Sequence, residues 1–129
     1  MSKSKLEDEN RAAPAHDGGT IEGRLERLAS AIWEVQAGAR ISPRTIKLLK
    51  SGRAKMAQKV IEEAAELGIE AVRGNRQNLI NESVDLFYNV VVLWRDMGIE
   101  PSEIWSEMDR REGLLGMSEK LPKSASDDT

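Results

Sequence analysis

Hydrophobic residues in the middle of the chain recur mostly at steps of three and four, which is the period of an amphipathic helix. The first such segment starts after Thr20, a suitable N-cap, and ends at Gly38. A short second helix is expected to begin at Ser42-Pro43, because proline suits the first helical turn, and to reach about Lys50. The pattern so far predicts helices and no strands.

Three further helical segments follow. The pattern predicts helices over residues 53–73 and 77–97, joined by a short turn at Gly74, and a last helix from about Pro101 with its apolar positions before Gly113. Short connections favour antiparallel neighbours. The fold class predicted is therefore all-α, a bundle of four to five helices.

Both ends of the chain differ from this middle part in composition. Residues 1–19 and 117–129 are polar and charged, and they contain proline or glycine and little apolar surface. We interpret the first range as a disordered N-terminal arm and the second as a flexible C-terminal tail. Residues 20–116 are left as one domain.

Composition excludes several kinds of chemistry. The chain has 129 residues, no cysteine and only His16, so thiol nucleophiles and Cys- or His-rich metal sites are excluded and any metal must be held by oxygen. The net charge of −3 argues against charge-driven binding of nucleic acid or membranes. No apolar run could span a bilayer and no signal peptide is visible, so we expect a cytoplasmic protein.

Acidic residues are clustered on two consecutive predicted helices. Glu63 and Glu66 share one side of their helix, and Glu82 and Asp85 repeat that spacing on the next. If the chain folds back near Gly74, the two pairs come level, and bare carboxylates there would repel each other. A hard divalent cation, Mg²⁺ or Mn²⁺, would relieve the repulsion and could bridge to a substrate's phosphates.

Other residues on these helices allow two interpretations. Lys55 and Lys59 precede Glu63 by two turns and one turn, so they could neutralise phosphate oxygens beside the metal. Alternatively, the acidic residues form the ordinary solvated face of amphipathic helices. The apolar character of the second acidic helix between Leu86 and Trp94 argues against this, because acidic groups on a buried helix need partners.

Two motifs carry a resemblance to a known family. The runs 59–66 (KVIEEAAE) and 82–88 (ESVDLFY) resemble the all-α nucleoside triphosphate pyrophosphohydrolase (MazG-like) superfamily, and within it the phosphoribosyl-ATP pyrophosphohydrolases. Segments 45–52, 108–113 and 118–121 support the likeness, which covers about residues 22–121.

The resemblance implies a function and a set of roles. It implies hydrolysis of an α–β phosphoanhydride, releasing pyrophosphate, by a homodimer or a larger assembly of dimers. Its metal, Mg²⁺ or Mn²⁺, would be held by Glu63, Glu66, Glu82 and Asp85. Glu62 and Glu63 would be the catalytic carboxylates, with Glu62 a further ligand or the base that orients water. The substrate-binding residues would be Lys55, Lys59, Asn89, Arg110 and Arg111.

The sequence departs from the family pattern at two positions. Asn89 stands where a histidine usually follows the tyrosine, and Arg44 replaces the aromatic residue expected before Thr45. Asn89 shares a helix face with Glu82, so it would lie near the metal or the phosphates. These departures leave open a housecleaning enzyme for free (deoxy)nucleoside triphosphates. If the acidic residues are plain surface, the chain is instead a non-catalytic helical dimer or binding module.

Overall fold

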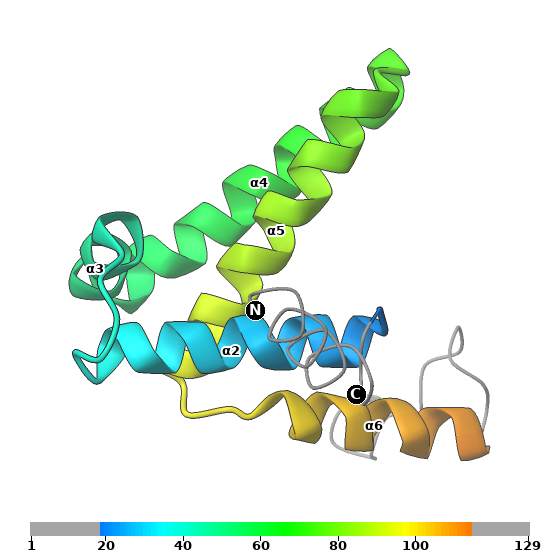
Figure 1. Cartoon of the computed structure of the whole chain (residues 1–129). Coiled ribbons are helices and arrows are strands. Elements are labelled where there is room, and N and C mark those ends of the chain that lie inside the picture. Colours follow the sequence, from blue (N-terminus) through cyan, green and yellow to red (C-terminus); the bar gives the residue numbers. More distant parts are fainter. Residues whose placement is uncertain (1–18, 115–129) are drawn as a thin grey trace, which may run out of the picture.

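The computed structural model describes residues 19–114, and all regular structure in that range is helical (Figure 1). The helices are α2 (Ile21–Gln36), α3 (Pro43–Lys50), α4 (Arg53–Arg73), α5 (Arg76–Asp96) and α6 (Pro101–Leu114). The predicted all-α class and the number of helices are confirmed. The predicted arm, apart from Gly19, and the predicted tail lie outside the described residues.

The helix ends follow the local signals in the sequence. The Thr20 side chain accepts a hydrogen bond from the Gly23 backbone N–H at 2.9 Å, which caps α2. Gly74 has a left-handed φ of 74° and makes the turn between α4 and α5. The last turn of α6 includes Gly113, since one glycine costs only about 1 kcal/mol of helix stability.

The longest helices, α4 and α5, form an antiparallel hairpin whose turn projects away from α2 and α6 (Figure 1). The core lies at the base of the hairpin and consists of Leu25, Ala29, Ile32, Met56, Val91 and Val92. We expected α5 to be buried between Leu86 and Trp94. This holds for Val91 and Val92, whereas Phe87 is exposed, since the outer part of the hairpin extends beyond α2.

Contacts of aromatic residues join α5 to α6 and α3 to α5. Trp94 and Trp105 meet edge to face with ring centroids 6.4 Å apart, which joins α5 to α6. Thr45 Oγ1 lies 2.6 Å from the Tyr88 hydroxyl oxygen and fastens α3 to α5. The second contact joins residues 43 positions apart in the sequence. None of the helices among the described residues is long and apolar enough to cross a membrane.

Candidate metal centre

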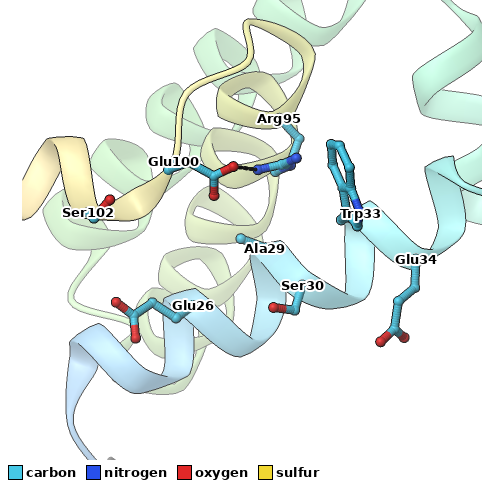
Figure 2. Close-up of a pocket in the computed structure, with 8 residues that line it drawn as sticks. All are labelled: Glu26, Ala29, Ser30, Trp33, Glu34, Arg95, Glu100 and Ser102. Atoms are coloured by element: carbon cyan, nitrogen blue, oxygen red, sulfur yellow. Dashed lines mark hydrogen bonds and ion pairs between the residues drawn. The ribbon is translucent and has the colours of Figure 1, made fainter.

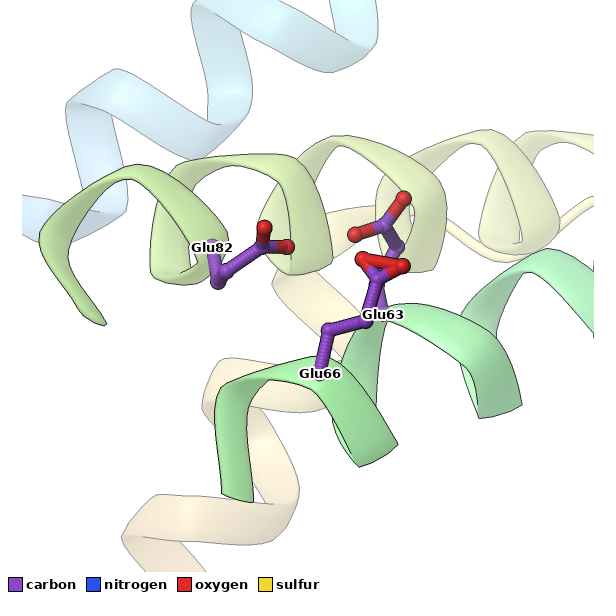
Figure 3. A group of neighbouring side chains, drawn as sticks. All are labelled: Glu63, Glu66 and Glu82. Atoms are coloured by element: carbon purple, nitrogen blue, oxygen red, sulfur yellow. The ribbon is translucent and has the colours of Figure 1, made fainter. Parts of the chain in front are cut away.

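Three glutamates of the hairpin come together at the seam between α4 and α5. Glu63 and Glu66 extend from α4 and Glu82 from α5, and their carboxylates point toward one another (Figure 3). One oxygen of each lies within 4.8 Å of the other two. The folding back of the chain at Gly74 therefore brings the two acidic motifs level, as the spacing predicted.

The electrostatics of this trio differ from those of a solvated acidic face. Glu63 is only 8% exposed, and Glu63 Oε2 and Glu82 Oε2 are buried oxygens without a hydrogen-bond donor. Two carboxyl groups so placed can form a hydrogen bond only by sharing a proton. That bond with Glu63, together with burial and the charges of Glu66, Glu63 and Asp85, raises the pKa of Glu82 from 4.5 to about 7.

The donor set fits a hard divalent cation. All three groups offer oxygen, which is what Mg²⁺ and Mn²⁺ prefer. The buried oxygens that lack a donor would gain a partner, and the repulsion that raises the pKa of Glu82 would be offset by the cation's charge. Without an ion, the raised pKa of Glu82 keeps that carboxyl group partly protonated near pH 7.

The other two predicted acidic residues lie beside this trio. Asp85 is one helical turn beyond Glu82 and contributes negative charge to it, but it is not among the three converging groups. Glu62 is exposed and accepts a hydrogen bond from Gln58 Nε2 at 2.8 Å. Among the described residues, the structure thus brings together three of the four predicted metal ligands.

One further acidic residue went unnoticed as a candidate. Glu70 lies one turn beyond Glu66 on α4, and its Oε1 is buried without a hydrogen-bond partner. Its Oε2 lies 3.6 Å from Arg73 Nη1. The signal was present in the sequence, because Glu70 continues the spacing of Glu63 and Glu66 along one helix face.

The predicted substrate-binding residues of α4 and α5 differ in exposure. Lys55 is exposed, and Lys59 Nζ lies 3.8 Å from Glu63 Oε1 and 3.9 Å from Glu62 Oε1. Asn89 is 1% exposed, and its Nδ2 donates to the Asp85 backbone oxygen at 2.8 Å. Its Oδ1 is buried without a partner. The structure therefore places Lys59 at the trio and turns the Asn89 amide toward its own helix.

Arg110 and Arg111 lie elsewhere in the chain. Both pair with Glu107 on α6, at distances of 3.2 Å and 3.0 Å. α6 contacts α5 through Trp105 and Trp94, and Trp94 is twelve residues or roughly 18 Å of helix beyond Glu82. Within one chain, these arginines are therefore not part of the acidic centre.

A cavity of about 460 Å³ lies away from the trio, between α2 and the junction of α5 with α6 (Figure 2). The buried Arg95 guanidinium stacks on the Trp33 ring, 4.2 Å from its centroid, and donates to Glu100 at 2.9 Å. The cavity's other carboxylates, Glu26 and Glu34, are bonded to Trp105 and Arg40. These contacts tie the α5–α6 connection to α2, so we interpret the cavity as part of the packing.

A helical hairpin with facing carboxylates is typical of the all-α nucleoside triphosphate pyrophosphohydrolase superfamily. A comparison with family models supports this superfamily and indicates one family within it. The model described as phosphoribosyl-ATP pyrophosphohydrolase matches residues 25–112, and the chain belongs to that family.

Curated relatives agree with this assignment. Phosphoribosyl-ATP pyrophosphatase 2 of Rhodopseudomonas palustris is 49% identical over 100 residues, which cover 78% of this chain and 76% of the relative. The protein of the same name from Bradyrhizobium diazoefficiens is 46% identical, with coverage of 78% and 75%. Phosphoribosyl-ATP pyrophosphatase of Gluconobacter oxydans is 43% identical, with coverage of 77% and 74%. No solved structure matched the chain.

Proposed function

We propose that this protein hydrolyses the α–β phosphoanhydride of phosphoribosyl-ATP, giving phosphoribosyl-AMP and pyrophosphate. This reaction is a step of histidine biosynthesis and takes place in the cytoplasm. The observation that carries the proposal is the convergence of Glu63, Glu66 and Glu82 in a member of this family. The proposed substrate is the one in the names of the relatives. The converging carboxylates support the proposal that a metal–polyphosphate group binds at this seam.

Each residue of the centre has a role in this proposal. Glu63, Glu66 and Glu82 hold Mg²⁺ or Mn²⁺, and Asp85 adds a further carboxylate one turn away. When bound, such an ion neutralises phosphate oxygens and lowers the pKa of water. The exposed Glu62 carboxylate accepts a proton from the attacking water, and Lys55 and Lys59 attract the phosphates.

A direct assay tests the activity. Purified protein with phosphoribosyl-ATP and MgCl₂ should release pyrophosphate and phosphoribosyl-AMP in equal amounts, and an excess of EDTA should stop the release. A panel of nucleoside and deoxynucleoside triphosphates tests the second candidate, housecleaning hydrolysis, which Asn89 favours because it departs from the family pattern. A strong preference for a free triphosphate would replace the proposed substrate by that one.

Metal binding should depend on pH with a definite sign. A cation must displace the proton that Glu82 holds with a pKa of about 7, so affinity for Mn²⁺ should fall about tenfold per pH unit below pH 7 and level off above it. Titration calorimetry from pH 5.5 to 8.5 measures this. Glu82→Gln should abolish the dependence. An equal Mn²⁺ affinity at pH 5.5 and 8 would contradict the proposed ligand.

The same pKa predicts the stability of the metal-free protein. Because the pKa of Glu82 is raised above its unfolded value of about 4.5, the native state holds this proton more tightly than the unfolded state does. Stability is then lost as pH rises from about 4.5 through 7. Thermal unfolding in EDTA should show a lower midpoint at pH 7.5 than at pH 5.5, and Glu82→Gln should reduce the difference.

We also propose that the protein is a homodimer joined through the outer part of the hairpin. Exposed apolar residues follow one stripe on α4 and another on α5, at helical spacing. They are Ile61, Ile69 and Val72 on α4, and Ile80, Val84 and Phe87 on α5. Apolar stripes of this kind are normally covered in a soluble assembly, and a second copy of the same hairpin offers a matching surface.

A charged residue in these stripes should separate the dimer. Ile61→Arg and Val84→Arg should each shift the mass measured by light scattering from twice 14.3 kDa to 14.3 kDa, because an arginine cannot be buried unpaired in an apolar contact. Ile41→Arg is the matched control, since Ile41 is 86% exposed between α2 and α3. A wild-type mass of 14.3 kDa at assay concentration would contradict the dimer.

A further inference from the structure

Arg44 projects from the start of α3 at a place fixed by hydrogen bonds. Ser42 Oγ donates to Thr45 Oγ1 at 3.1 Å, and Thr45 Oγ1 lies 2.6 Å from the Tyr88 hydroxyl oxygen. Thr45 is buried, so this chain of hydroxyl groups seats the first turn of α3 on α5. The Arg44 guanidinium carbon lies 4.8 Å from the centroid of the Tyr88 ring.

This contact with the Tyr88 ring leaves the Arg44 guanidinium available to other partners. A guanidinium that lies over an aromatic face keeps its N–H donors in its own plane, where they can bind a phosphate through two hydrogen bonds. Arg44 is exposed, and no carboxylate among the described residues pairs with it. By contrast, Arg40 pairs with Glu34 and Arg53 with Asp96.

The surroundings of Arg44 favour an anion. From residue 35 to residue 61 the chain contains seven basic residues and no acidic one. This range includes all of α3 and the first turns of α4, so the segment that approaches the acidic centre is positively charged. Tyr88 follows Glu82 by six residues on α5, which is about 9 Å along the helix axis. Six residues also turn the helix, so Tyr88 and the cationic position beside it lie on a neighbouring face of α5, about 120° around the axis from Glu82.

We propose that Arg44 binds a second anionic group of the substrate, the phosphate monoester of the ribosyl unit, while the triphosphate lies at the carboxylate trio. This inference rests on the proposed function. Phosphoribosyl-ATP carries such a phosphate in addition to its triphosphate, whereas ATP carries only the triphosphate. Arg44 is therefore a specificity-determining residue that distinguishes the two nucleotides.

The experiment compares both nucleotides in one series of variants. Arg44→Gln should lower kcat/KM for phosphoribosyl-ATP about 10- to 100-fold, mainly through KM, and change that for ATP by less than about twofold. Arg44→Lys should lower kcat/KM for phosphoribosyl-ATP by less than Arg44→Gln does, since lysine keeps the charge but lacks the planar guanidinium. Lys50→Gln removes one positive charge from the other end of α3. It should leave the ratio of kcat/KM for the two nucleotides unchanged. If ATP is not hydrolysed, its inhibition constant takes the place of kcat/KM.

The outcomes separate the inference from the function. An equal loss for both nucleotides in Arg44→Gln would mean that Arg44 only supports α3 and Tyr88, and it would overturn the inference. No loss for either nucleotide would also overturn it, although hydrolysis of phosphoribosyl-ATP by the wild type would still support the proposed function. If the wild type releases no pyrophosphate from phosphoribosyl-ATP, the function itself fails.

Discussion

Glu63→Gln is expected to lower pyrophosphate release from phosphoribosyl-ATP by about 100-fold or more. Glu63 is the most buried member of the trio, and one of its oxygens lacks any donor in the protein. Glutamine keeps the shape but loses the negative charge, and an amide is a far weaker ligand for a hard cation than a carboxylate. Steady-state assays at saturating Mg²⁺ measure the effect.

A stability measurement separates this effect from misfolding. In EDTA at pH 8, Glu63→Gln should unfold at the same temperature as the wild type or a higher one, because it removes one of several repelling charges and its amide can donate to Glu82. Glu112→Gln, an exposed carboxylate on α6, is the control and should retain full activity. Activity within threefold of wild type in Glu63→Gln would exclude Glu63 as an essential ligand.

The helices of this protein could be predicted closely because their ends are marked by local chemistry. Thr20 is an N-cap, Pro43 starts α3, and glycines follow or separate the helices at residues 38, 52, 74 and 98, each with positive φ. Such signals depend on neighbours within one turn, so they can be recognised without the fold. The helix predicted over residues 77–97 spans Arg76–Asp96 in the structure, a shift of one residue.

The composition of the site was harder to predict, because it depends on how two helices rotate and slide against each other. Spacing predicts that Glu82 and Asp85 share a helix side, but only the packed hairpin shows that Glu82 joins the trio and that Asp85 stands one turn away. Likewise, spacing placed Asn89 near the phosphates, and packing buries it. The Thr45–Tyr88 contact joins residues 43 positions apart, which no local pattern indicates.

Met56→Ala should cause the largest loss of stability among single substitutions in the described core. Met56 is 1% exposed and lies where α4 meets α2 and α5, beside Ile32 and Val91. Truncation to alanine removes buried apolar surface and leaves a cavity, which costs about 2–4 kcal/mol in comparable cores. Because only the base of the hairpin packs on α2, few other contacts can compensate.

Urea denaturation measures this loss of stability as a shift of the midpoint at an unchanged slope. The thermal midpoint should fall by on the order of 10–20 °C for a domain of this size. Ile41→Ala removes a similar apolar side chain that is 86% exposed, and it should change the free energy of unfolding by less than about 0.5 kcal/mol. Equal effects of the two substitutions would mean that α4 is not held to the core through Met56. Glu63 and Glu66 follow Met56 on α4 by two turns or more. The position of the trio would then depend on contacts other than those of Met56.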